Sequence, residues 1–373
     1  MRKKILLIFG TRPEAIKMGP LFKEFQNQSE IFDTKVCVTA QHREMLDQVL
    51  DFFEIEPDYD LDLMKPSQNL YGLTATIIES LKPILEEFNP NYVFVHGDTT
   101  TTMAGSIASF YSGAKVCHVE AGLRTNNKLS PFPEEINRQI TGRICDYHFA
   151  PTENSKNNLL KENIAESSIL VTGNTVIDAL IKSVKKVNES PSQFIQDLSK
   201  KIGNQELVLV TGHRRENHGE GFERICKALK TIALDNNDRL VIYPVHLNPA
   251  VKEPVNRILS GIKNIILIDP LAYKDFVWLM NRSKIIITDS GGIQEEAPSL
   301  GKPVLVIRDT TERPEAIEAG TVLLVGTDED LIVSKALDLL NNEDNFIKMS
   351  KLHNPYGDGL ASKRIVEFIK NIK

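Results

Sequence analysis

Short apolar runs rich in valine and isoleucine recur along this chain, and segments long enough for amphipathic helices separate most of them. The runs are continuous rather than alternating, which suits parallel strands covered by helices on both faces. They fall at residues 5–9, 36–39, 92–96, 116–119, 147–150 and 169–172, and again at 207–210, 240–244, 265–268, 285–288, 304–307 and 322–325. The pattern predicts an α/β fold with two doubly wound parallel sheets.

Two domains are expected, because 373 residues exceed the size at which a single core keeps growing. A polar stretch over 185–205 separates the two sets of runs, and each set opens with a strand, a glycine and a basic turn. We therefore predict two Rossmann-like domains whose sheets face a cleft, residues 1–173 with 357–373 and residues 174–356. A lysine-rich amphipathic helix at the end of the chain is predicted to return to the first domain.

Composition narrows the function classes. Hydrophobic residues make up 41% of the chain and charged residues 25%, as in soluble globular proteins, and a net charge of -6 leaves no basic surface for nucleic acid. The first residues match neither a signal peptide nor a membrane span. The four cysteines have no paired spacing, so we expect reduced thiols and a cytoplasmic protein.

A glycine pair follows the predicted strand over 285–288 and opens a helix. Gly291 and Gly292 allow a ligand to approach the backbone closely, the Ser290 hydroxyl adds a donor, and the free amides of a helix start suit a diphosphate. Glu296 lies about one helical turn further along, where a carboxylate can accept both hydroxyls of a ribose. The motif predicts a nucleoside diphosphate site; a capped helix with glycines for packing is the alternative.

Three carboxylates occupy strand ends or loop tips of the first domain. Asp98 follows the strand over 92–96, Glu120 follows the strand over 116–119, and Glu134 stands in a stiff proline-rich loop. A single such acid would be an ordinary charge at a helix start. Three together predict general acid and base catalysis, because desolvation and neighbouring carboxylates raise a pKa toward the range useful for proton transfer.

Basic residues also follow the predicted strands. Arg12 and Lys17 are candidate counter-charges for phosphate, with a solvated basic face as the alternative. His213 follows the first strand of the second domain and is expected to face the diphosphate. Arg313 is a further candidate partner of phosphate or ribose, with a surface ion pair as the alternative.

No catalytic metal is expected. His96 is close in sequence to Asp98, and His118 to Glu120, but alternate residues of a strand point to opposite faces and no histidine or cysteine pair completes a site. The segment 10–17 lacks the glycine-rich interior and the Gly-Lys-Ser/Thr ending of an ATP-binding loop, so an ATPase is not favoured either.

With these motifs in place, the chain resembles the non-hydrolysing UDP-N-acetylglucosamine 2-epimerases over essentially its full length. The strings that carry the resemblance are FGTRPEAIKMGPL, CVTAQHREMLDQVL, HGDTTTT, HVEAGLRT, PFPEEINR, VTGNTVIDAL, TGHRRE, YPVHLNP, TDSGGIQEEAPSLGKPVL and RDTTERPEA. The resemblance implies a glycosyltransferase-B-like fold and the interconversion of UDP-GlcNAc and UDP-ManNAc with no cofactor. It also implies a homodimer that supplies ManNAc units for a capsule or another surface polysaccharide.

The family reaction starts with elimination of UDP, which leaves a 2-acetamidoglucal, and ends when UDP adds back and a proton returns to the other face of C2. The resemblance assigns acid and base work to Asp98, Glu120 and Glu134 and gives His213 a role at the UDP end. The residues that it places around the substrate are Arg12, Lys17, Arg138, His213, Phe276, Ser290, Gly291, Gly292, Glu296 and Arg313.

A second UDP-GlcNAc site, which activates the enzyme, is found in many bacterial relatives. Gln41 and His42 match the string associated with that site, with a polar cluster at a helix start as the alternative. Gln68 stands where some relatives have arginine, so the resemblance implies allosteric activation without fixing its strength.

Three other functions remain open at this point. An epimerase for a related nucleotide sugar, such as UDP-2,3-diacetamido glucose, needs the same motifs. A glycosyltransferase of the same fold needs an acceptor pocket and does not need three carboxylates around C2. A nucleotide-sugar binding protein predicts that Asp98, Glu120 and Glu134 can be neutralised without biochemical consequence.

Overall fold

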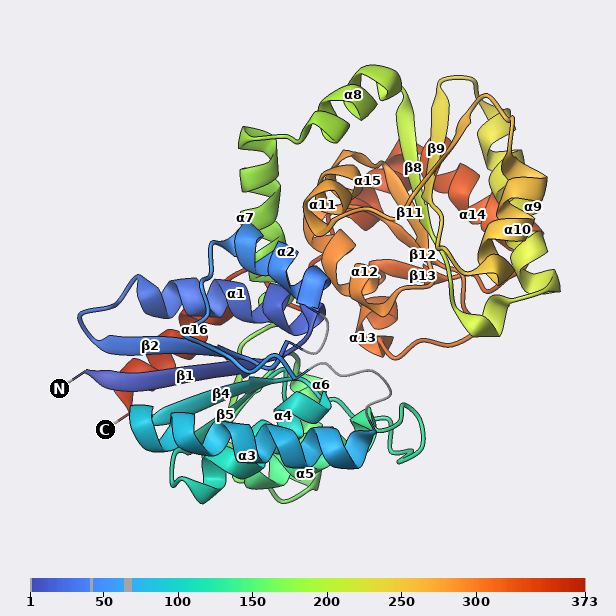
Figure 1. The fold of residues 1–373 in the computed structure, drawn as a ribbon. Coiled ribbons are helices and arrows are strands. Elements are labelled where there is room, and N and C mark those ends of the chain that lie inside the picture. The colour runs from blue at the N-terminus through green and yellow to red at the C-terminus, as the bar shows by residue number, and fades with distance from the viewer. Residues whose placement is uncertain (1, 41–42, 64–68, 373) are drawn as a thin grey trace. The chain divides into compact units, whose positions relative to one another are not determined.

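The structure is a computed structural model that describes residues 2–40, 43–63 and 69–372. It divides into two compact units, which we call the N-terminal unit (Met1–Ala179 with Tyr356–Lys373) and the C-terminal unit (Leu180–Pro355). The predicted boundaries, after residues 173 and 356, lie six residues before and one residue after these divisions. Each unit is a parallel sheet with helices on its faces (Figure 1).

The N-terminal unit contains a seven-stranded sheet in the order β3-β2-β1-β4-β5-β6-β7, with every pairing parallel. Its strands are β1 (Lys3–Phe9), β2 (Phe32–Val38), β3 (Tyr59–Asp60), β4 (Tyr92–His96), β5 (Lys115–Val119), β6 (Tyr147–Ala150) and β7 (Ile169–Val171). The strand β2 pairs with one edge of β1, and β4 pairs with the opposite edge of β1. The carboxyl ends of β1 and β4 therefore form the topological switch point where ligands of such sheets bind.

Helices cover both faces of this sheet. They are α1 (Arg12–Gln26), α2 (Arg43–Phe53), α3 (Leu70–Phe88), α4 (Thr100–Tyr111), α5 (Glu134–Ile144), α6 (Glu153–Lys161), the 3-10 helix η1 (Glu166–Ser168), α7 (Thr175–Glu189), which continues beyond Ala179, and α16 (Ala361–Asn371). The C-terminal α16 packs against α1. The ring of its Phe368 meets the rings of Tyr147 and Phe149 edge-on, with centroid distances of 5.5 and 5.7 Å. The predicted terminal helix thus belongs to the N-terminal unit.

The C-terminal unit repeats the arrangement with six parallel strands in the order β10-β9-β8-β11-β12-β13. Its strands are β8 (Glu206–Thr211), β9 (Arg239–Pro244), β10 (Ile265–Ile268), β11 (Ile285–Thr288), β12 (Val304–Val306) and β13 (Val322–Leu324). Its helices are α8 (Gln193–Ile202), η2 (Arg215–Asn217), α9 (Glu220–Asp235), α10 (Pro249–Leu259), α11 (Tyr273–Arg282), α12 (Gly291–Glu296), η3 (Ala297–Leu300), α13 (Pro314–Glu318), α14 (Glu329–Asn341) and α15 (Glu343–Ser350). The switch point lies between β8 and β11.

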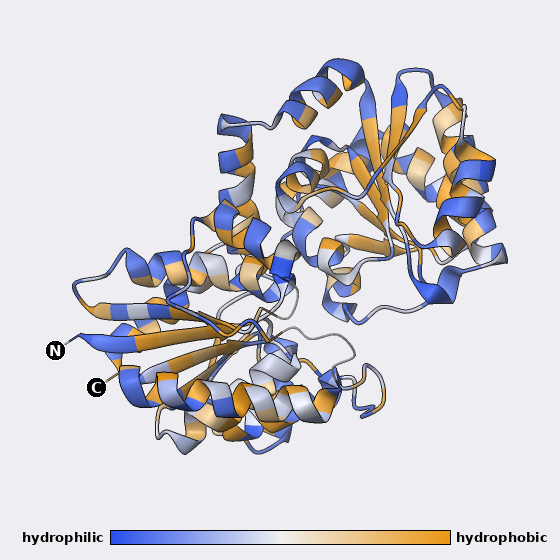
Figure 2. Ribbon diagram, viewed as in Figure 1, coloured by the Kyte–Doolittle hydropathy of each residue, from blue (hydrophilic) through white to orange (hydrophobic). Residues whose placement is uncertain are grey.

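The prediction of two parallel sheets is confirmed, since every apolar run named above forms a strand. Figure 2 shows the strands as mostly hydrophobic and the helices as hydrophilic on one side. The two-residue β3 is an additional strand, too short to leave a pattern in the sequence. The polar stretch over 185–205 is largely helical, because it holds the end of α7 and all of α8.

All four cysteines are free thiols, and burial raises the pKa of Cys37 and Cys226 to about 12. These thiols are therefore poor nucleophiles at neutral pH. Within the described ranges, none of the helices combines the length and the apolarity that a membrane span requires.

Candidate active site

Glu120 is the residue around which polar groups of the N-terminal unit gather. It directly follows β5, its side chain is 7% exposed, and its φ of 63° lies in the left-handed region that costs energy for a side chain of this size. Its Oε2 accepts hydrogen bonds from Lys17 Nζ, from His96 Nε2 at 3.1 Å and from Asn174 Nδ2 at 3.3 Å. The strained backbone and the three donors together fix the direction of this carboxylate.

The charge state of Glu120 follows from these contacts. Burial by itself would raise the pKa of Glu120, but the Lys17 ammonium and the His96 imidazole outweigh burial and hold the pKa well below its usual range. The carboxyl group is therefore an anion at neutral pH. Lys17 pairs with this buried carboxylate and is itself only 16% exposed, so the alternative of a solvated basic face is wrong for Lys17.

Asp98 lies two residues beyond the end of β4, and β4 is the strand that pairs with β5. Its Oδ2 accepts a hydrogen bond from Arg138 Nη2 at 2.6 Å, and its carbonyl accepts one from Asn137 Nδ2 at 3.0 Å. Arg138 Nη1 also lies 3.3 Å from the fully buried Glu135 carboxylate. The structure thus joins two predicted residues, Asp98 and Arg138, and Glu135, which was not predicted, also pairs with the arginine.

Two neighbouring carboxylates at the start of α5 have different surroundings. Glu135 accepts hydrogen bonds from the amides of Thr125 and Asn126 at 3.0 and 3.1 Å, which fixes the preceding loop. Burial would raise the pKa of Glu135, but the Thr125 amide and its other donors lower it. Glu134 Oε2, in contrast, is buried and has no hydrogen-bond partner within the described part of the chain. A buried unpaired oxygen needs an explanation, and a ligand is one.

The histidines near these acids do not make the pairs considered from the sequence. His96 contacts Glu120 rather than Asp98, and His118 Nε2 bonds to the Gly97 carbonyl at 2.7 Å. Burial lowers the pKa of His118 to about 3, so its ring is neutral. Over residues 2–40, 43–63 and 69–372, the structure contains no cluster of three or more His, Cys, Asp or Glu side chains that could hold a metal ion.

Glu14 is a buried residue beside the candidate site that the sequence reasoning did not single out. It is buried, and its carboxylate accepts hydrogen bonds from the amides of Gly10 and Thr11 at 3.0 and 2.8 Å and from the Thr99 hydroxyl at 2.7 Å. These bonds tie the turn after β1, where Arg12 begins α1, to the turn after β4. The Thr-x-x-Glu spacing of Thr11 and Glu14 in the sequence is that of a capping box, so it could have predicted the local bonds of Glu14. It could not have predicted the bond to Thr99, which is distant in sequence.

The turn after β11 leaves room at the start of α12. A Cβ atom on Gly291 or Gly292 would come no closer than 3.9 or 3.7 Å to its neighbours, and neither glycine has a positive φ. Ser290 occupies the N-cap position, but its hydroxyl makes no capping hydrogen bond. No close contact requires glycine at either position, and Ser290 supplies no capping hydrogen bond, so these contacts give no support to the alternative of a capped helix with glycines for packing. The amides of a helix start suit a bound anion.

Arg313 and Glu296 border the same turn. The Arg313 guanidinium lies beside Gly291, and its Nε donates to Glu295, which is 2% exposed. This ion pair is largely buried, so the alternative of a surface ion pair is wrong. Glu296 Oε1 lies 3.7 Å from the position that a Cβ on Gly292 would take. The four predicted residues of this turn and Arg313 are thus neighbours.

His213 follows β8 and is held by Asp289, which is fully buried. Asp289 Oδ2 accepts the amides of His213 and Arg214 at 2.7 and 2.8 Å, and Oδ1 lies 3.6 Å from His213 Nδ1. Burial lowers the pKa of His213, Asp289 opposes this effect, and His246, stacked at 5.2 Å, adds to it. The ring is therefore neutral at neutral pH. Asp289 was not among the predicted site residues, although a polar residue directly after a buried strand was a signal.

Phe276 is partly buried on α11, and α11 packs against η3, the segment that continues α12. The preceding residue, Asp275, lines a hollow of about 650 Å³ beyond β9 and β10. Gln41, His42 and Gln68, the residues predicted for an allosteric site, lie outside the described residues.

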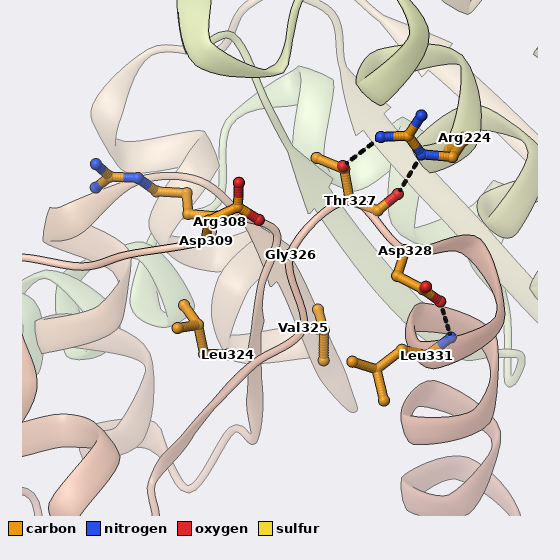
Figure 3. A pocket seen from close by; sticks show the side chains of 9 residues that line it. All are labelled: Arg224, Arg308, Asp309, Leu324, Val325, Gly326, Thr327, Asp328 and Leu331. Atoms are coloured by element: carbon orange, nitrogen blue, oxygen red, sulfur yellow. Dashed lines mark hydrogen bonds between the residues drawn. The ribbon is translucent and has the colours of Figure 1, made fainter.

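A pocket of about 510 Å³ lies beyond β12 and β13, at the start of α14 (Figure 3). Its lining residues are Arg224, Arg308, Asp309, Leu324, Val325, Gly326, Thr327, Asp328 and Leu331. Arg224 is bonded to Thr327 at 2.9 and 3.0 Å, and Arg308 is bonded to Glu216 and Glu312 at 2.6 and 2.7 Å. Both arginines already have partners, and this pocket is separate from the turn at Ser290.

The model of the family described as UDP-N-acetylglucosamine 2-epimerase matches residues 23–370. A UDP-N-acetylglucosamine 2-epimerase from Yersinia pestis is 59% identical over 99% of this chain and 98% of its own length. The chain belongs to the UDP-N-acetylglucosamine 2-epimerase family. It is an isomerase of the epimerase class, as predicted.

Solved structures agree with this family. The UDP-GlcNAc 2-epimerase of Neisseria meningitidis, solved with UDP-GlcNAc bound, is 52% identical and has a TM-score of 0.86 over 98% of this chain and 99% of its own. A glycosyltransferase from Rickettsia africae is 16% identical with a TM-score of 0.64 over 99% of this chain and 98% of its own, and shares the fold alone. The predicted glycosyltransferase-B-like fold of this epimerase family member is confirmed.

Proposed function

We propose that this chain interconverts UDP-GlcNAc and UDP-ManNAc through elimination of UDP and re-addition to a 2-acetamidoglucal. The observation that carries the proposal is Glu120, a strained, buried carboxylate that Lys17 and His96 keep anionic. Such a group is unprotonated at neutral pH and can accept a proton, but its pKa is lowered and not raised as the sequence suggested, so it is a weak base that acts only once the C2 proton has been made acidic. The substrate is supported by the Neisseria meningitidis relative, 52% identical and solved with UDP-GlcNAc bound.

The C2 hydrogen of the sugar is not acidic, so the order of steps matters. Departure of UDP from C1 creates oxocarbenium character, which makes the C2 proton removable. Asp98, Glu120 and Glu134 form the acid and base set that removes this proton and returns one to the other face of C2. Arg138 holds Asp98 at 2.6 Å, and the unpaired buried oxygen of Glu134 supports a direct contact with the sugar.

The leaving diphosphate binds the C-terminal unit in this proposal. The helix-start amides at Gly291 and Gly292 and the neighbouring Arg313 guanidinium stabilise its charge, and Glu296 accepts the ribose hydroxyls. His213, held by Asp289, offers a ring N–H to the departing oxygen. Arg12, Lys17 and Phe276 complete the substrate-binding set by the resemblance.

We further propose a cytoplasmic homodimer that supplies ManNAc units for a surface polysaccharide such as a capsule, and activation by a second UDP-GlcNAc at Gln41, His42 and Gln68. Four free thiols support a reducing compartment. Sedimentation velocity tests the dimer. The rate with UDP-ManNAc alone, compared with the rate after a trace of UDP-GlcNAc is added, tests the activation.

The deciding experiment is proton NMR of UDP-GlcNAc incubated with the purified protein in heavy water, without added NAD or metal. We expect UDP-ManNAc with deuterium at C2. If the UDP-GlcNAc spectrum is unchanged and the protein converts UDP-2,3-diacetamido glucose, the related nucleotide sugar is the substrate and UDP-GlcNAc is not. If UDP is released only when a sugar acceptor is present, the reaction is glycosyl transfer and not epimerisation.

A further inference from the structure

Asn174, at the N-terminus of α7, is a buried residue to which the reaction described above gives no role. Its side chain is held on both sides, because Oδ1 accepts a hydrogen bond from the Val176 amide at 3.1 Å and Nδ2 donates to Glu120 Oε2 at 3.3 Å. Since an amide oxygen cannot donate, the bond to Val176 determines that the Nδ2 end faces the carboxylate.

The contact with Asn174 makes Glu120 asymmetric. Oε2 has three donors, on Lys17, His96 and Asn174, whereas Oε1 has no hydrogen bond to any residue in the described part of the chain. A carboxylate held through one oxygen leaves the other for a reacting proton. The donors come from three elements, α1, the end of β4 and the start of α7, so each restricts rotation of the carboxylate from a different direction.

Asn174 also lies near the two ends of the N-terminal unit, five residues before Ala179 in sequence and bonded to the segment that resumes at Tyr356. The Asn174 amide donates to the carbonyl of Tyr356 at 2.7 Å, so the outgoing and the returning segments are bonded at this residue. Gly173 and Gly357 pack against each other there: a Cβ on Gly173 would stand 3.2 Å from the Gly357 Cα, and both have positive φ. Asp178 accepts two amides at the start of α16, which fixes α7 to that helix.

We propose that Asn174 is a positioning residue that holds Glu120 Oε2 so that Oε1 faces the sugar, and that links this orientation to the two chain segments at the ends of the N-terminal unit. The inference rests on the proposed function, since it needs Glu120 to act on the substrate. Lys17 and His96 are the charged and titratable groups that face Glu120, and Asn174 adds a neutral donor. Replacing this donor with a carboxylate therefore changes the charge balance at Glu120.

The test is Asn174→Asp in the full-length protein. The variant keeps an oxygen for the Val176 amide but places a second carboxylate oxygen against Glu120 Oε2. We expect kcat to fall roughly tenfold and the acid limb of the kcat/KM profile to move to higher pH, with KM for UDP-GlcNAc changed much less. Asn342→Asp is the matched control, because Asn342 caps α15 in the same way and is exposed; its profile should match wild type.

An Asn174→Asp profile that coincides with wild type, in a protein with an unchanged melting temperature, overturns the proposal. Asn174→Ser is a second variant that keeps the proposal testable if Asn174→Asp does not fold, because serine keeps a capping oxygen and adds no charge. It should lower kcat and move the acid limb to higher pH by less than Asn174→Asp does, because it removes a donor to Glu120 without adding a charge. A serine variant with wild-type kcat would contradict a positioning role.

Failure of the proposed function is separable from failure of this inference. If wild-type protein incorporates no deuterium at C2 of UDP-GlcNAc, the proposed function fails. The ¹³C NMR titration of the Glu120 carboxylate without substrate, assigned by its loss in Glu120→Gln, then decides the role of Asn174. A higher midpoint in Asn174→Asp supports the contact, and an unmoved midpoint overturns it.

Discussion

The candidate site residues of the two units, which we call the N-terminal and the C-terminal half of the set, are of different kinds. In the N-terminal unit, charged side chains are buried and paired, as in the bonds of Glu120 with Lys17 and of Asp98 with Arg138. In the C-terminal unit, the turn at Gly291 and Gly292 places helix-start backbone without bulky side chains beside one guanidinium. The comparison teaches that one half is suited to control of protonation, which needs low dielectric and fixed partners, and the other to recognition of a diphosphate.

Among the substitutions proposed here, Glu120→Gln should have the largest effect on turnover, and it tests whether the two units have separate roles. Glutamine keeps the shape but cannot accept a proton from carbon, so kcat should fall by about 10²- to 10⁴-fold. Binding of UDP, measured by isothermal titration calorimetry, should be unchanged, because the diphosphate is assigned to the other half. Glu153→Gln, on the exposed start of α6, is the control and should keep wild-type kcat. Loss of UDP affinity in Glu120→Gln would contradict this division of labour.

Gly292→Ala tests the recognition half. A methyl group fits the folded protein, since its nearest neighbour would lie 3.7 Å away, but it occupies space assigned to the diphosphate. We expect UDP affinity to fall roughly tenfold, about 1.4 kcal/mol, with little change in melting temperature. Gly122→Ala makes the contrast, because its Cβ would stand 2.2 Å from the Ser155 carbonyl oxygen; it should lower the melting temperature. Unchanged UDP binding in Gly292→Ala would remove this turn from the site.

Lys17→Met sharpens the account of charge in the N-terminal half. The folded-state pKa of Glu120 is lowered, so the anion is the active and the stabilised form above that pKa, and both advantages are lost as pH falls through it. Removal of the ammonium raises the Glu120 pKa. The acid limb of kcat/KM should therefore move to higher pH, which a rate profile measures. An acid limb that stays in place would mean that Lys17 does not set the charge of Glu120.

Asp289→Asn should have the smallest effect on turnover. Asparagine still offers one acceptor to the amides of His213 and Arg214, but the buried site loses charge-assisted hydrogen bonds, and we expect a loss of about 1 to 3 kcal/mol in unfolding free energy. Chemical denaturation measures this loss. Full stability in the variant would indicate that Asp289 does not hold the turn after β8.

Local patterns predicted the fold because buried parallel strands need continuous apolar residues. The runs at β4, β5, β8 and β11 are such strands, and the residues shortly after them include Asp98, Glu120, His213 and the Ser290-Gly291-Gly292 turn. The pattern failed at β3, which is only two residues long. It also gave no sign that the segment over 185–205 is largely helical, since its polar residues masked the apolar face of α8.

The sequence predicted many of the candidate site residues, but it did not predict which of them bond to one another. Asp98 and Arg138, which are 40 residues apart, are bonded, and so are Lys17 and Glu120, which are 103 apart. No local spacing encodes such partners. Glu14, Asn174 and Asp289 were missed for the same reason, because each acts through at least one group distant in sequence.

The sequence by itself determined the two parallel sheets, the strand ends at which polar residues gather, and, through its motifs, the family. Apolar periodicity and turn composition are local properties, so they are readable along the chain. Only the tertiary structure decided that Lys17 and His96 hold Glu120 as an anion, which glycines have room for a methyl group, and that Asn174 bonds Glu120. These properties depend on burial and on partners brought together by folding, because desolvation and charge proximity act through space and not along the sequence.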